Sequence, residues 1–136
     1  MQKVRVEVVW CNKNFAATLG GNVPGNVLVT AKTYSKLKTE VKEALEFHIQ
    51  GMVEDGENVP QWLVEGDYEF KWCIADTASL IQSLEGMTTI AAISRATGIN
   101  ERLLSHYANG IKIPSAKQRQ KIIDGIHQIG KSLMNI

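Results

Sequence analysis

The residues of this sequence best suited to chemistry are hydrogen-bonding side chains between positions 100 and 109. Six of them would share one polar face of a helix: Asn100, Glu101, Arg102, Ser105, His106 and Asn109. In the DNA major groove an Arg can contact a guanine through two parallel hydrogen bonds, a Glu can accept from a cytosine amino group, and Ser and His can reach base edges or phosphates. A polar face of this kind is typical of a helix that lies in the DNA major groove.

Presenting that face requires two short helices joined by a tight turn. We expect the first helix at 89–97 and the second at 101–109, with Gly98 in the left-handed conformation that ends a helix and Asn100 as the N-cap of the next. The apolar residues expected to hold the pair together are Ile93, Ile99, Leu104 and Tyr107. A helix, a glycine turn and another helix are equally typical of plain packing in an all-helical fold.

Polar residues at the ends of these helices are placed for contacts to phosphate groups. They are Thr88, Thr89, Asn100, Asn109 and Lys112. The charge of the chain is also divided: residues 77–136 carry 7 Lys/Arg and 3 Asp/Glu, whereas residues 1–76 carry 8 and 11. An acidic first part and a basic second part predict two modules, 1–75 and 76–136, and favour nucleic acid as a partner of the second.

The first module alternates apolar and polar residues and is expected to contain four strands and one long helix. We predict strands at 3–10, 15–19, 26–31 and 67–74, a helix at 34–52 and a loop at 53–66. The apolar stripe of this helix comprises Tyr34, Leu37, Val41, Ala44, Leu45, His48 and Met52. The second module should begin with a helix from Thr77 that ends at Gly86, and should close with a helix at 116–134. The inward stripe of that last helix comprises Ile122, Ile126, Ile129 and Leu133.

Other chemistry has little support in the composition. The chain is 44% hydrophobic and 21% charged, and it lacks an apolar run of the about 18 residues that a membrane helix needs. Cys11 and Cys73 are far apart and form no CxxC motif, which favours reduced thiols and the cytoplasm. Three scattered histidines predict neither a metal site nor a cofactor. Carboxylates that could converge on metal ions are missing, so nuclease activity is kept only as an alternative, and we expect no enzyme.

The order of residues in the second half resembles the lambda-repressor-like (XRE-type) helix-turn-helix family. The resemblance rests on Thr89, Gly98-Ile99-Asn100, Leu104-Ser105, Gly110 and Pro114-Ser115, and it covers the chain from near Leu80 to Leu133. It implies double-stranded operator DNA as the partner, with Glu101, Arg102, Ser105 and His106 at the positions that face bases. One such module contacts too few phosphates and bases for useful specificity, so a homodimer or tetramer is expected.

The first half resembles the HicB antitoxins. The resemblance rests on Val23-Pro24-Gly25, on the helix start at Thr33 and on Ala44, Phe47 and His48 near the helix end. It implies an α+β fold: a truncated RNase-H-like αβ domain (three-stranded meander, helix, fourth strand) followed by the all-α helix-turn-helix domain. It also implies that the chain neutralises a HicA-like toxin, which cleaves mRNA, and that the chain represses its own operon. The alternatives are an orphan DNA-binding regulator or a non-DNA interaction module without a cognate toxin.

Overall fold

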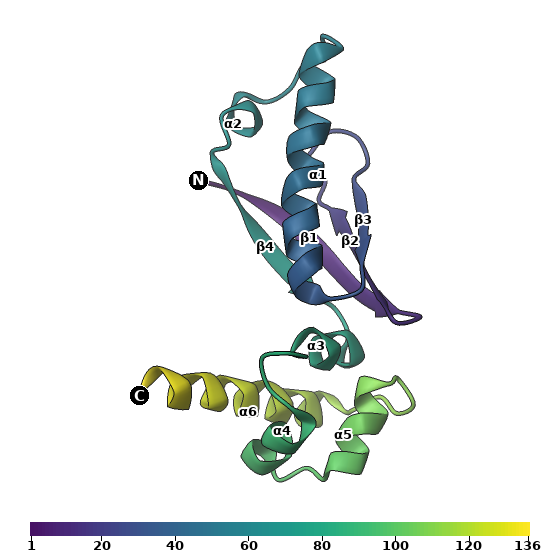
Figure 1. Cartoon of the computed structure of the whole chain (residues 1–136), viewed down its shortest axis with the longest axis vertical. Helices are drawn as coiled ribbons and strands as arrows, with labels where there is room; N and C mark the ends of the chain where they lie inside the picture. The colour runs from purple at the N-terminus through teal and green to yellow at the C-terminus, as the bar shows by residue number, and fades with distance from the viewer. The chain divides into compact units, whose positions relative to one another are not determined.

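The computed structural model describes all residues, 1–136, and has an α+β fold with a four-stranded mixed sheet and six helices. The chain divides into two compact units, Met1–Ala75 and Asp76–Ile136. All the strands belong to the first unit, and the second unit consists of helices (Figure 1). None of the helices combines the length and the apolar character that crossing a membrane requires.

The sheet of the first unit has the strand order β3-β2-β1-β4. Strands β1 (Gln2–Cys11), β2 (Asn14–Leu19) and β3 (Leu28–Ala31) pair antiparallel in succession, and β4 (Tyr68–Ile74) pairs parallel to β1. The parallel pairing needs a crossover, which the intervening helices provide. The turn between β1 and β2 places Asn12 and Lys13 in the left-handed region.

Helix α1 (Tyr34–Glu54) lies across one face of the sheet (Figure 1). Alternation along β1 turns Val4, Val6 and Val8 toward this helix, and all three are fully buried. The buried residues of α1 are Leu37, Val41, Leu45, Ile49 and Met52. Ile49 was not part of the expected stripe, although its spacing from Leu45 fits the helix period. The opposite face of the sheet carries charged side chains, including the ion pair between Lys3 and Glu69 on neighbouring strands.

The expectation of a loop throughout 53–66 is wrong in part, because this segment contains the short helix α2 (Gln61–Val64). Leu63 of α2 is buried in the core of the first unit, and Trp62 meets the ring of Tyr68 edge-on at 6.3 Å. Pro60 precedes the helix with a φ of −54°, which suits the start of a helix. A single turn has too few residues to show an apolar period, so the sequence pattern could not reveal it.

The second unit contains α3 (Thr77–Ser83), α4 (Ile90–Thr97), α5 (Glu101–Ala108) and α6 (Ala116–Met134). Its core includes the four apolar residues expected to join the helix pair, and comprises Ile81, Ile93, Ile99, Leu104, Tyr107, Ala108 and Ile122. Helix α3 ends before the expected Gly86, because the backbone N–H of Leu84 bonds the carbonyl of Ile81 and tightens the last turn.

The last turn of α6 departs from the expected inward stripe. Ile122 is fully buried and Ile126 and Ile129 are half-buried, but Leu133 is 60% exposed. Helix α6 has 19 residues whereas α4 has 8, and at about 1.5 Å per residue the shorter helix cannot cover the longer one. The expectation for Leu133 is therefore wrong, and its position on the stripe reflects only the helix period.

Candidate nucleic-acid interface

The turn between α4 and α5 is held by side-chain hydrogen bonds as well as by Gly98. Gly98 adopts a φ of +77°, which costs a glycine little. The hydroxyl of Ser94 donates to the carbonyl of Ile99 at 2.6 Å. The hydroxyl of Thr97 donates to the carbonyl of Ile93 at 2.7 Å and accepts from the N–H of Ile99 at 3.2 Å. These bonds fix the direction in which the chain leaves α4 and hence the orientation of α5.

Neighbouring helices position α5 at its other end. The side-chain amide of Gln82 in α3 donates to the carbonyl of Ala108 at 2.9 Å, which satisfies one of the last carbonyls of α5. Helix α6 lies close to α4 at Gly125, where an added Cβ would meet the γ-methyl of Thr97. Arg119 of α6 donates to the hydroxyl of Thr77 at 3.1 Å, at the first residue of α3. The helix pair is therefore held from both sides.

The polar face expected on α5 is exposed to different degrees. Glu101 and Arg102 are exposed, whereas Ser105 and His106 are half-buried. Leu104, Tyr107 and Ala108 point into the core. At about 100° per residue, the side chains from Glu101 to Asn109 that face outward span an arc of about 140°. Such an arc is wide enough to present several donors and acceptors to one groove.

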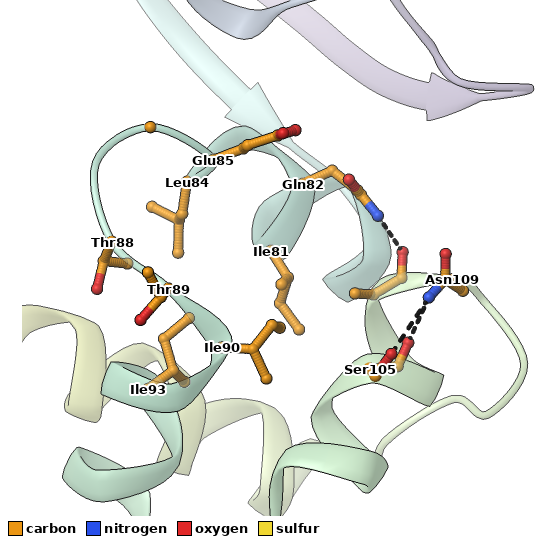
Figure 2. Close-up of a pocket in the computed structure, with 12 residues that line it drawn as sticks. Ile81, Gln82, Leu84, Glu85, Thr88, Thr89, Ile90, Ile93, Ser105 and Asn109 are labelled. Carbon is orange, nitrogen blue, oxygen red and sulfur yellow. Dashed lines mark hydrogen bonds between the residues drawn. The ribbon is translucent and has the colours of Figure 1, made fainter.

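Eight of the nine predicted contact residues line two separate hollows beside α5, and Glu101 lines neither. Thr88, Thr89, Ser105 and Asn109 line a pocket of about 440 Å³ between α3, α4 and α5. Figure 2 shows the two threonines on one side of this pocket and Ser105 and Asn109 on the other. The other residues line a separate shallow hollow with Leu103 and are Asn100, Arg102, His106 and Lys112.

Three of the predicted phosphate contacts already make hydrogen bonds within the chain. Thr89 accepts from the N–H of Ala92 at 3.1 Å and Asn100 accepts from the N–H of Leu103 at 2.8 Å, so both act as helix N-caps. The side-chain amide of Asn109 donates to the carbonyl of Ser105 at 2.8 Å (Figure 2). Arg102, His106 and Lys112 therefore carry the donors of this face that are best placed for a ligand.

Sequence reasoning missed two exposed apolar residues beside this face. Ile111 and Ile113, on either side of Lys112, are 67% and 92% exposed. They stand between Gly110 and Pro114, two turn-forming residues that leave no room for a helix or strand. No helix or strand can direct an isoleucine between such residues into the core. The exposure of Ile111 and Ile113 could therefore have been predicted from their position between Gly110 and Pro114. Apolar side chains next to donors can contact thymine methyl groups.

The structure places no group of three or more His, Cys, Asp or Glu side chains where they could hold a metal ion. Comparison of the chain with protein-family models, with curated proteins and with solved structures gave no match.

Proposed function

We propose that the second unit binds double-stranded operator DNA as a helix-turn-helix of the lambda-repressor-like type. Helix α5 would enter the major groove, with Arg102 donating to a guanine and His106 to a base edge or phosphate. Glu101 and Ser105 would complete the base contacts, and Lys112 would contact the DNA backbone. The observation that carries the proposal is that the α4–α5 turn is fixed while α5 turns Arg102 outward and Leu104 and Tyr107 inward.

We further propose that the first unit is a HicB-like, partial RNase-H-like domain. It would bind and neutralise a HicA-type toxin that cleaves mRNA, and the chain would act by binding alone. The strand order, a sheet covered by α1 on one face and the acidic balance of residues 1–76 support this proposal. A homodimer or tetramer would place two copies of α5 about 34–36 Å apart, the spacing that reads a palindromic site.

Fluorescence anisotropy of the full chain with DNA from upstream of its own gene tests the repressor proposal. Binding should be sequence-specific and should weaken with salt, because phosphate contacts release counterions. Arg102→Ala should lower specificity at one base pair by about 1–3 kcal/mol. Lys121→Ala, which changes an exposed cation on α6, is the matched control and should keep the specificity. Equal binding to scrambled DNA by the folded chain would refute the proposal and favour an interaction module that does not bind DNA.

Co-expression tests the antitoxin proposal. A HicA-type toxin encoded beside the gene for this chain should arrest growth when it is expressed alone, and the chain should relieve that arrest. Arg102→Ala should relieve it equally well, because the substitution lies in the DNA-binding unit. Persistent arrest in the presence of the soluble chain would count against the antitoxin role and leave the DNA-binding result untouched.

A further inference from the structure

The first unit has a hollow of about 390 Å³ beside the C-terminal half of α1. The opposite wall is the segment that leads into β3, which is an outer strand of the sheet. The residues that line it from α1 and its C-terminal end are Ala44, Phe47, His48, Gly51, Met52, Asp55 and Glu57, and those from the other wall are Asn26, Val27 and Leu28. The hollow lies within one compact unit, so its shape does not depend on how the two units are placed.

Phe47 is the most unusual side chain of this hollow because it is 80% exposed. On the helix surface its neighbours at three- and four-residue spacing are Glu43, Ala44, Gln50 and Gly51. Leu28, on the opposite wall, is 67% exposed. Two large apolar side chains at the edge of one hollow would gain free energy if a partner covered them.

Gly51 gives an independent indication of a missing neighbour. It lies inside α1, where glycine is less favourable than alanine because it loses more conformational freedom. A Cβ added there would meet no atom of the chain within 4 Å. No close approach within this chain therefore requires a glycine at position 51. A partner whose atoms come close to the helix backbone would require one.

The charges around the hollow point to the kind of partner. Residues 43–57 contain five acidic residues and no Lys or Arg, and Asp55 and Glu57 line the hollow itself. Helix α1 has no basic residue in its last turn, and its last residue and its C-cap are Glu54 and Asp55. The C-terminal end of a helix carries partial negative charge, so acidic side chains there are unfavourable in the isolated chain. A cationic partner would offset this repulsion.

A hydrogen bond and a close backbone approach join the helix wall of the hollow to the loop before β3. His48 bonds the carbonyl of Pro24 through Nε2 at 2.6 Å. Gly25 adopts a φ of +80°, and a Cβ there would lie 2.8 Å from the His48 ring. The loop and the helix therefore fit together closely at this point. Preorganised walls reduce the entropy that is lost on binding.

We propose that this hollow binds a cationic segment of a partner protein that inserts one large apolar side chain between Phe47 and Leu28. The apolar side chain would pass over Gly51, and flanking Lys or Arg residues would face Asp55 and Glu57. The proposal rests on the proposed function in one respect, namely that the first unit binds a protein. A toxin that cleaves mRNA must attract phosphates and is expected to carry such a cationic surface.

A peptide selection on the immobilised full-length chain tests the proposal. Random twelve-residue peptides are selected on the wild type, and the affinity of the enriched peptides is then measured by fluorescence anisotropy at two salt concentrations. The test variant is Gly51→Gln, which fills the hollow with a good helix former. The matched control is Gly130→Gln, since a Cβ at Gly130 of α6 also meets no atom within 4 Å. Thermal unfolding of both variants monitors their folding.

Enriched peptides should have a net positive charge and one large apolar residue, and should bind more weakly at higher salt. Gly51→Gln should weaken binding about tenfold or more, as the filling of a central pocket does, whereas Gly130→Gln should bind like the wild type. Neither variant should unfold at a lower temperature than the wild type. Failure to enrich peptides, neutral peptides or equal binding by Gly51→Gln would overturn the proposal. Relief of toxin arrest together with any of these results would show that the toxin binds elsewhere.

Discussion

Replacement of Gly125 by alanine should destabilise the helical unit, whereas the same replacement at Gly130 should not. Both glycines lie in α6. A Cβ at position 125 would lie 2.5 Å from Cγ2 of Thr97, but a Cβ at position 130 would meet no atom within 4 Å. Thr97 cannot simply rotate away, because its hydroxyl bonds the carbonyl of Ile93 and the N–H of Ile99.

The expected magnitude follows from two opposing effects. Overpacking a well-packed contact costs about 1–3 kcal/mol, and rotation of Thr97 would instead break two hydrogen bonds worth about 1 kcal/mol each. Alanine is favoured over glycine in a helix by about 1 kcal/mol, which acts at both positions. Gly125→Ala should therefore lower the free energy of unfolding by about 1 kcal/mol, and Gly130→Ala should raise it by up to about 1 kcal/mol. The difference between the variants, about 2 kcal/mol, is the quantity to test.

Hydrogen–deuterium exchange of the full chain measures this difference in peptides from α4 and α6, with peptides from the sheet as an internal reference. A second substitution identifies the cause. Thr97→Ser removes Cγ2 but keeps the hydroxyl, so it should restore stability in the Gly125→Ala chain although it costs the wild type about 0.8 kcal/mol. Equal stability of Gly125→Ala and Gly130→Ala, or a cost that Thr97→Ser adds to rather than removes, would refute the close approach of α4 and α6.

Three further predictions concern local interactions. Asn100→Ala removes the side chain that accepts from the N–H of Leu103 and should destabilise the helical unit by about 1 kcal/mol in urea unfolding, whereas Asn100→Asp should not. Gly25→Ala should lower the free energy of unfolding of the first unit by about 1–3 kcal/mol, because a Cβ at this positive φ would overlap the His48 ring. The NMR chemical shifts of the His48 ring should change in this variant, and unchanged shifts would count against this reasoning. Burial raises the pKa of Tyr34. The contribution of Tyr34 to the free energy of unfolding is therefore complete below the pKa of an unfolded tyrosine, about 10, and declines as the pH rises from there through the higher folded pKa. Tyr34→Phe should reduce the loss of stability between pH 9 and pH 11, which urea titrations at the two pH values measure.

The sequence predicted the elements whose signals are local. The N-cap expected at Asn100, and Thr33 and Ser115 directly before the helices expected at 34–52 and 116–134, each accept a hydrogen bond from the backbone N–H three residues later. The expected bounds of the last helix, 116–134, are those of α6. A cap is decided by the residue itself and its next three neighbours, so it can be found without knowledge of the fold. The α+β class followed because strand and helix periods differ clearly along the first unit.

Features decided by distant contacts could not be found in this way. The parallel pairing of β4 with β1 joins residues more than 60 positions apart, and strand alternation alone does not give its direction. The predicted DNA contacts were placed on one face, yet Ser105 and Arg102 line different hollows. The three-residue offset between them puts their side chains about 60° apart on α5, and only the packing of α3 and α4 creates a pocket on one flank.

Glycines inside helices show where the sequence and the structure each carry information. Read from the sequence alone, Gly51 and Gly125 are the same exception, a poor helix former within an apolar stripe. The structure separates them, because Thr97 fills the space at Gly125 whereas nothing in the chain approaches Gly51. Gly130 is open as well, but the side chains around it on α6 carry charges of both signs, Asp124 and Lys131. Gly51 instead lies near exposed Phe47 and near Glu54 and Asp55, in a stretch, 43–57, that contains no Lys or Arg. Three features that are each unfavourable in the isolated chain coincide at this one place, and a single cationic partner with an apolar side chain would account for all of them.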